Sequence, residues 1–234
     1  MGVSPAGWCF LLVISALFPL LAIRTAFAVR QPGRTPTAAQ HLASVAISQA
    51  MMLLLALCAL RSDALELFPP LELGWKEPLL ALAFLAPALG TLPLRWRWKP
   101  LEQRRRNLWL YPRGPRDLAR WAIVSLLAGT IEEIVYRGVL LQLWQRLLGS
   151  WWPAMLVCVL VFSVAHFVQG WRAMVVILAL GAASHLIVRL TGNLYTAMFV
   201  HVVYDFAAGI VLMRLARADG LLEAASETSG SPAE

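Results

Sequence analysis

Residues 129–138 read Gly-Thr-Ile-Glu-Glu-Ile-Val-Tyr-Arg-Gly, and they place three charged side chains in an otherwise apolar part of the chain. The charges are Glu132, Glu133 and Arg137, and the flanking sequence is built mainly from Leu, Ile, Val, Ala and Trp. A charge at the centre of a membrane helix costs about 2.5–3.5 kcal/mol on insertion scales. Three charges within six residues therefore indicate a partnered polar site inside a helix bundle.

The composition of the whole chain indicates an integral membrane protein. Of its 234 residues, 59% are hydrophobic and 14% are charged, whereas a soluble domain is about 45–50% apolar and about 25% charged. A bilayer crossing takes about 20 apolar residues. We therefore predict an all-α, polytopic membrane helix bundle of about seven transmembrane helices, with six or eight as the alternatives.

The apolar stretches of the sequence define the predicted spans. They are Trp8–Val29, His41–Leu60, Pro78–Leu94, Leu118–Leu148, Trp152–Val168, Ala173–Leu190 and Leu194–Leu215. The fourth stretch is too long for a single crossing. It is expected to contain an interfacial turn at each end, or a break near Gly138.

The positive charge of the chain is concentrated in one segment. Nine of the twenty Lys and Arg residues lie between Arg95 and Arg120, together with Trp and Tyr residues of the kind found at membrane interfaces. We interpret the 95–120 segment as a cytoplasmic loop that faces anionic lipid headgroups. Nucleic acid is not an expected partner. The positive-inside rule then predicts a multi-pass protein of the inner (plasma) membrane, with its N-terminus outside and its C-terminus inside.

Three regions are predicted along the chain. Residues 1–117 hold N-terminal transmembrane helices and the basic loop, and residues 118–218 hold the helices that carry the chemistry. Residues 219–234 are small, polar and acidic, and we expect a disordered tail there. The three cysteines lie in apolar runs without CxxC spacing, so neither a disulfide framework nor a cysteine zinc site is expected.

Helix geometry separates the two adjacent glutamates. Residues four apart share one face of a helix, whereas adjacent residues diverge by about 100°. Glu133 and Arg137 are therefore expected to form an i,i+4 ion pair. Glu132 points elsewhere, and it is the better candidate for a general base because no cation on its own helix neutralises it.

Other polar residues of the predicted spans lie at a similar depth to Glu132. From the cytoplasmic side, a rise of about 1.5 Å per residue puts Glu132 at about 16 Å and His166 at about 10 Å. The same arithmetic puts His201 at about 20 Å and Asp205 at about 14 Å. His201 and Asp205 are one turn apart on one helical face. We therefore expect these four side chains to share one site near the middle of the membrane.

Three motifs on hydrophobic segments follow one another in an order that is typical of a known family. They are Glu132-Glu133-x-x-x-Arg137, Phe162-x-x-x-His166 and His201-x-x-x-Asp205. In order and spacing they resemble the CPBP (Abi) family of CAAX prenyl proteases and bacteriocin-processing or myxosortase-like enzymes. The resemblance covers about residues 118–210.

The resemblance implies a glutamate-dependent intramembrane endopeptidase. Glu132, with His166, would activate a water molecule that attacks the scissile carbonyl group. His201 and the residue at position 205 would stabilise the resulting oxyanion. The third motif of the family often ends in Asn, and an ionised Asp205 would oppose an oxyanion. Three alternatives are therefore open for Asp205: it is protonated, it orients His201, or it binds a metal.

The remaining motif residues are expected to support the site. The resemblance implies that Glu133 and Arg137 hold the helix and its charge balance, and Phe162 is expected to pack beside them. Two histidines and two carboxylates could in principle bind Zn²⁺. However, the sequence has no HExxH motif, and the family is usually described as metal-independent. We therefore expect no cofactor, and keep zinc as the alternative.

The predicted function is the cleavage of a membrane-associated protein or peptide near its terminus. The short loops and the Arg-, Ala- and Leu-rich composition indicate a bacterial source. Three alternatives remain open. The chain could be a non-catalytic membrane scaffold or bacteriocin-immunity protein that keeps the motifs as an ion-pair network, a zinc-dependent membrane protease, or a small proton-coupled transporter.

Overall fold

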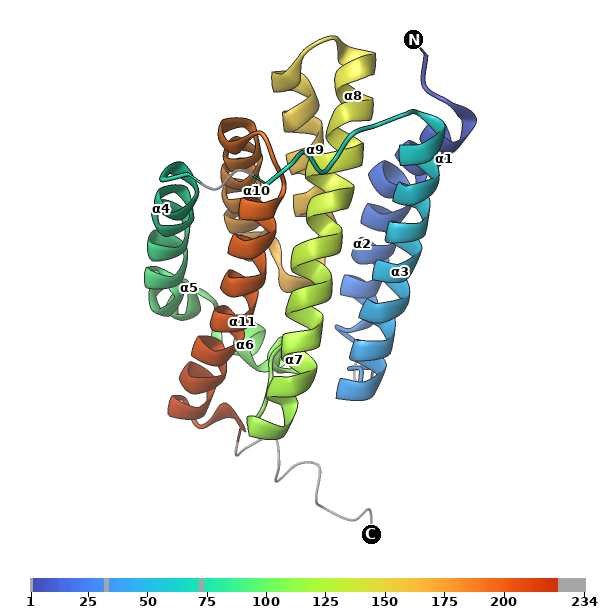
Figure 1. Cartoon of the computed structure of the whole chain (residues 1–234). Helices are drawn as coiled ribbons and strands as arrows, with labels where there is room; N and C mark the ends of the chain where they lie inside the picture. The colour runs from blue at the N-terminus through green and yellow to red at the C-terminus, as the bar shows by residue number, and fades with distance from the viewer. Residues whose placement is uncertain (1, 32–33, 72–73, 223–234) are drawn as a thin grey trace.

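The computed structural model describes residues 2–31, 34–71 and 74–222, and every regular element in these ranges is a helix (Figure 1). The elements are α1 (Pro5–Leu12), η1 (Val13–Leu17), α2 (Phe18–Ala28), α3 (Ala38–Ser62), α4 (Lys76–Gly90), α5 (Leu92–Trp98), α6 (Leu101–Arg106), η2 (Leu108–Leu110), α7 (Pro115–Leu127), η3 (Ala128–Leu140), α8 (Leu141–Leu148), α9 (Trp151–Ala165), η4 (Phe167–Gln169), α10 (Trp171–Thr191) and α11 (Tyr195–Ala218). The all-α prediction is confirmed.

Consecutive elements join into long rods that run roughly along one axis (Figure 1). Within the residues that the structure describes, five helical stretches are long and apolar enough to cross a membrane. They are Pro5–Ala28, Ala38–Ser62, Lys76–Trp98, Trp171–Thr191 and Tyr195–Ala218. The α7–η3–α8 rod and the shorter apolar helix α9 complete the bundle. The polytopic helix bundle predicted from composition is therefore the observed architecture.

The fourth predicted span is a single unbroken rod. α7 continues into η3, a π-helical segment of 13 residues, and η3 continues into α8. The break expected near Gly138 is absent, because Gly138 is an interior residue of η3 against which Leu67 packs. The rod of residues 115–148 is about 50 Å long, so it extends beyond a hydrocarbon core of about 30 Å.

The fifth predicted span ends earlier than expected. α9 has 15 residues and stops at Ala165, which makes it about 22 Å long. The chain then turns through η4 and Gly170, whose φ of 95° lies in the region that favours glycine. The carbonyl of Gln169 in this turn accepts hydrogen bonds from Gln103 and Asn107, both at 3.0 Å. The short helix therefore places His166, at its end, within the bundle.

Small residues set the distance between α11 and the rod that carries the glutamates. Gly129 lies against the backbone of Val202, and Gly209 lies against the indole ring of Trp121. The Trp121 indole N–H donates to the carbonyl of Asp205 at 3.0 Å. Close approach of this kind is typical of packed membrane helices. It brings the polar faces of η3 and α11 together.

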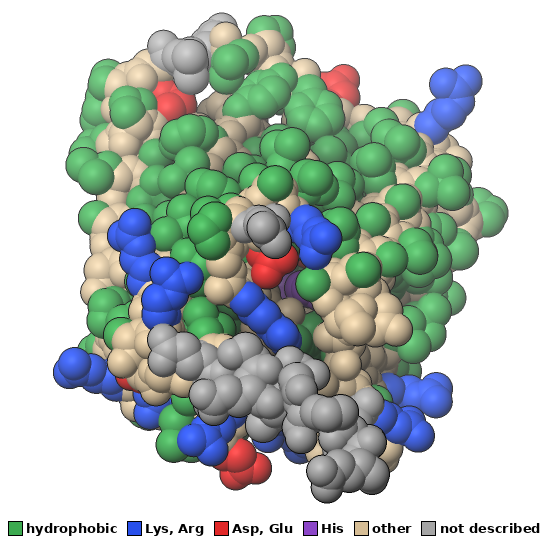
Figure 2. All heavy atoms as spheres, turned by 90° about the horizontal axis from the view of Figure 1, so that it is seen from below, with side chains coloured by type: hydrophobic (Ala, Val, Ile, Leu, Met, Phe, Trp, Pro, Cys, Tyr) green, Lys and Arg blue, Asp and Glu red, His purple; other side chains and the backbone are tan. Residues whose placement is uncertain are grey.

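Positively charged side chains gather at one end of the bundle (Figure 2). The start of α1 lies at the opposite end from the end of α11, which is close to α6 and the start of α7 (Figure 1). Figure 2 views this second end, where Lys and Arg side chains surround the face. The 95–120 segment, which was predicted as a loop, consists largely of the end of α5, α6, η2 and the start of α7.

The C-terminal region is ordered for longer than predicted. Asp219 forms an ion pair with Arg104 and accepts a hydrogen bond of 2.8 Å from the Trp96 indole. Leu221 is buried in the apolar cluster that contains Trp96. Residues 219–222 are therefore packed rather than part of a tail. The rest of the predicted tail, 223–234, lies outside the described residues.

Candidate active site

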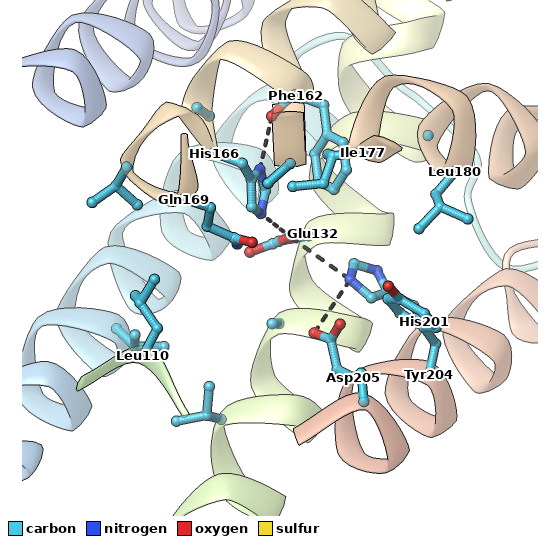
Figure 3. Close-up of a pocket in the computed structure, with 18 of the residues that line it drawn as sticks. Leu110, Glu132, Phe162, His166, Gln169, Ile177, Leu180, His201, Tyr204 and Asp205 are labelled. Atoms are coloured by element: carbon cyan, nitrogen blue, oxygen red, sulfur yellow. Dashed lines mark hydrogen bonds and ion pairs between the residues drawn. The ribbon is translucent and has the colours of Figure 1, made fainter. Parts of the chain in front are cut away.

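Glu132 lies on η3 at the centre of a group of polar side chains (Figure 3). It is 8% exposed. Its Oε1 atom accepts a hydrogen bond of 2.8 Å from Nε2 of Gln49 on α3. Its Oε2 atom lies 3.9 Å from Nε2 of His166 and 4.0 Å from Nε2 of His201. One oxygen is therefore held by an amide, and the other faces two imidazoles.

Glu133 is buried in a separate set of contacts. One carboxylate oxygen lies 3.2 Å from Nη1 of Arg137, so the predicted i,i+4 ion pair is confirmed. Its two oxygens also accept hydrogen bonds from Nδ1 of His201 at 2.7 Å and from Oγ of Ser184 at 3.0 Å. The side chain has no exposed surface. These contacts hold the Glu133 carboxylate in place and balance its charge.

His201 connects the two glutamates. The sequence predicted that this ring shares a site with Glu132, His166 and Asp205, but Nδ1 also bonds Glu133 while Nε2 faces Glu132. Oδ2 of Asp205, one turn further along α11, lies 3.5 Å from the same Nε2 atom. A ring with carboxylates at both nitrogens is suited to donate protons on both sides. Of the roles considered for Asp205, this contact fits an orienting partner of His201.

The protonation pattern of His166 follows from its backbone contact. Its Nδ1 atom lies 2.8 Å from the carbonyl oxygen of Phe162. Since a carbonyl can only accept, Nδ1 carries the hydrogen. In the neutral ring Nε2 is then an acceptor, and it is the atom that faces Glu132.

Phe162 packs between the charged groups of the site. The guanidinium of Arg137 lies 4.3 Å from the centre of its ring. The ring of His166 lies 4.6 Å away on centroid distance, and that of His201 lies 6.3 Å away. A cation above an aromatic face is stabilised by the ring quadrupole. Arg137 and both imidazoles therefore pack against the aromatic ring of Phe162.

The site opens into a cavity of about 620 Å³. Most of its lining surface is apolar, and the residues that line it include the cations Arg95, Lys99 and Arg172. Figure 3 shows Glu132, His166, His201 and Asp205 directed toward one another beside this space. Ligand pockets typically measure about 300–1,000 Å³. The cavity is therefore large enough for a short peptide segment.

Two residues of the site were missed in the sequence analysis. Gln49 was hidden because α3 carries no charged motif, although it is a buried amide in an apolar span. Ser184 was hidden because serine is common in membrane helices. A depth estimate applied to every intramembrane polar residue would have proposed both.

A metal site was the alternative use of the same side chains. In residues 2–31, 34–71 and 74–222, no group of three or more His, Cys, Asp and Glu side chains has an arrangement that could hold a metal ion. The absence of a cofactor remains a prediction for experiment.

The fold and the site together define a class of protein: a polytopic helical membrane protein with a buried glutamate–histidine site beside an internal cavity. Residues 114–207 match the family model of the type II CAAX prenyl endopeptidase Rce1-like proteins. This segment therefore belongs to the CPBP family of CAAX proteases, and the resemblance seen in the three motifs is confirmed. The match supports a CAAX-type intramembrane endopeptidase as the general class of activity. No curated protein and no solved structure gives a significant match.

Proposed function

We propose that the chain is a glutamate-dependent endopeptidase that cleaves a membrane-associated protein or peptide near its terminus. The observation that carries the proposal is the position of Oε2 of Glu132, which lies within 4.0 Å of Nε2 of both His166 and His201. A carboxylate and two imidazoles around one point are suited to move the protons of a hydrolysis reaction.

Glu132 acts as the general base. A water molecule beside its Oε2 atom donates one hydrogen to Glu132 and the other to Nε2 of His166. As the water oxygen bonds to the scissile carbonyl carbon, Glu132 takes the first proton. When the carbon–nitrogen bond breaks, Glu132 returns this proton to the leaving amine. The proton that Glu132 takes from water is thus the proton that the leaving amine receives, and the step needs no cofactor.

His201 stabilises the oxyanion that develops during this attack. Its Nδ1 hydrogen is committed to Glu133, at 2.7 Å, which leaves the Nε2 side for the substrate oxygen. Asp205 lies at 3.5 Å from Nε2, so it orients the ring and balances a positive imidazolium rather than binding the oxyanion itself. Preorganised donors of this type contribute about 10²–10³-fold to kcat.

The substrate enters the cavity from the membrane, at the basic end of the protein. The cavity is mostly apolar, and Arg95, Lys99 and Arg172 are among the residues that line it. Nine Lys and Arg residues between positions 95 and 120 support contact of this end with anionic headgroups of the inner (plasma) membrane. The proposed cleavage is therefore on the cytoplasmic side.

The direct test replaces Glu132 with Gln, which keeps its size but removes the base. Purified protein in liposomes is incubated with membrane peptides that carry candidate C-terminal sequences, and the products are identified by mass spectrometry. We expect Glu132→Gln to lower kcat by about 10²–10⁴-fold. The matched control is Glu102→Gln, on the exposed surface of α6, and it should cleave like the wild type.

Two results would contradict parts of this proposal. Unchanged cleavage by Glu132→Gln would remove Glu132 from catalysis. Loss of wild-type cleavage on chelation, restored by Zn²⁺, would replace the metal-independent mechanism with the zinc alternative.

A further inference from the structure

Gln49 brings the N-terminal helices into contact with the proposed base. It lies on α3, outside the residues that match the family, and its side chain is buried, with 4% exposed. Its Nε2 atom lies 2.8 Å from Oε1 of Glu132, 83 residues further along the chain. This is the one direct hydrogen bond of the Glu132 carboxylate among the residues that the structure describes.

The chemistry of the pair fixes the orientation of the Gln49 amide. An ionised carboxylate only accepts hydrogen bonds, so the NH₂ group must face Glu132. The amide oxygen, Oε1, then points away, and within the described residues this buried atom has no hydrogen-bond partner. A buried acceptor without a partner destabilises a fold. An apolar side chain would remove this penalty, so the amide is not explained by packing.

The contact determines which way the Glu132 carboxylate faces. Separations of 3.9 Å and 4.0 Å from the two imidazoles exceed a direct hydrogen bond. Gln49 therefore holds one oxygen of Glu132, and the geometry of the planar carboxylate directs the other oxygen to His166 and His201. Without the amide, the carboxylate could rotate away from both rings.

We propose that Gln49 is a positioning residue, which holds Oε1 of Glu132 so that Oε2 meets the histidines. The proposal rests on the function proposed above, because it gives Gln49 a role through Glu132. It also makes α3 part of the catalytic apparatus, although the family match begins only at residue 114.

The test uses full-length protein in liposomes and the peptide that the wild type cleaves. Gln49→Met keeps the length of the side chain but removes both amide atoms, and Gln49→Asn keeps the amide but withdraws it from Glu132. A hydrogen bond to a charged group corresponds to about 10–100-fold in rate. We expect Gln49→Met to lower kcat by about this factor and to change KM by less than about twofold, because the lost contact acts on the chemical step. Gln49→Asn should fall between Gln49→Met and the wild type.

The matched control is Gln142→Met on α8. Gln142 also donates from its amide, to the carbonyl of Glu66 at 2.9 Å, but it is not among the residues that line the cavity. Its kcat per folded molecule should equal that of the wild type. If Gln49→Met does not fold, Gln49→Asn carries the test alone.

The outcomes separate this inference from the proposed function. A wild-type kcat in the folded Gln49 variants, with Glu132→Gln inactive, would overturn the role of Gln49 and leave the proposed base intact. Full activity of Glu132→Gln would overturn the proposed function itself. A lower thermal midpoint in Gln49→Met with an unchanged kcat would reduce Gln49 to a packing residue.

Discussion

At the scale of single residues, the adjacent carboxylates of Glu132 and Glu133 have different environments and different roles. Glu133 is saturated by Arg137, Ser184 and His201, whereas Glu132 has one oxygen in contact with Gln49 and one directed at imidazoles. A saturated carboxylate cannot easily take up a proton from water, but it can hold a histidine in place. The adjacent position of the two residues in sequence thus serves two separate tasks.

The buried ion pair provides a prediction about stability. Arg137→Met would leave Glu133 without its cation, and uncompensated buried charges cost about 3–5 kcal/mol. We expect a much lower thermal midpoint, measured by circular dichroism in detergent. In the double variant Glu133→Gln/Arg137→Met both charges are absent, so it should be more stable than Arg137→Met alone.

The control for this prediction is an exposed pair. Arg120 lies 3.5 Å from Asp117 with 54% of its side chain exposed, and such pairs contribute about 0–1 kcal/mol. Arg120→Met should therefore leave the midpoint almost unchanged. A double variant as unstable as Arg137→Met would mean that the charge imbalance is not the cause.

Residue spacing predicted some of these contacts and not others. The Glu133–Arg137 pair follows from one helix, because residues four apart share a face. The nearness of Glu132 to His166 and His201 could be estimated from depth along separate helices. The double contact of His201 and the amide of Gln49 could not, since they depend on how helices rotate against each other in the folded bundle.

At the scale of elements, the site depends on the close packing of α11 against the long rod. Gly209 faces the indole of Trp121, and a Cβ atom at this position would overlap the ring. Trp121 in turn bonds the carbonyl of Asp205. A displacement of α11 would therefore move His201 and Asp205 away from η3.

We accordingly predict that Gly209→Ala impairs both stability and cleavage. Overpacking of a core costs about 1–3 kcal/mol, and the displaced histidine should lower kcat several-fold. Thermal unfolding and peptide cleavage measure the two effects. Gly90→Ala, where a Cβ meets no atom within 4 Å, is the matched control and should be neutral. Wild-type cleavage by a folded Gly209→Ala would show that the site tolerates a shift of α11.

The helix boundaries show what sequence patterns can locate. Hydrophobic runs located the long spans well, because burial in lipid needs a continuous apolar stretch. They did not reveal that η3 is a π-helix or that α9 stops at Ala165. The turn after α9 depends on tertiary contacts, because Gln103 and Asn107 donate hydrogen bonds to the carbonyl of Gln169 there.

At the scale of the whole molecule, the polarity of the bundle bears on where cleavage occurs. α6 and the turn between α8 and α9 lie at opposite ends of the rods (Figure 1). If the 95–120 segment is cytoplasmic, as its nine basic residues predict, then the turn near Ser150 is outside. The cavity, whose lining includes the glutamates, Arg95 and Lys99, would then lie against the cytoplasmic side of the bundle.

Thiol labelling tests this orientation. In a variant without Cys9, Cys58 and Cys158, single cysteines are introduced at the exposed positions Glu102 and Ser150. A membrane-impermeant thiol reagent applied to intact spheroplasts should label Ser150→Cys and not Glu102→Cys, and lysis should expose both. Charged loops of this size follow the positive-inside rule because moving many cations across the membrane is unfavourable. The reverse pattern would put the basic end of the bundle outside, and would require substrates that approach from the opposite leaflet.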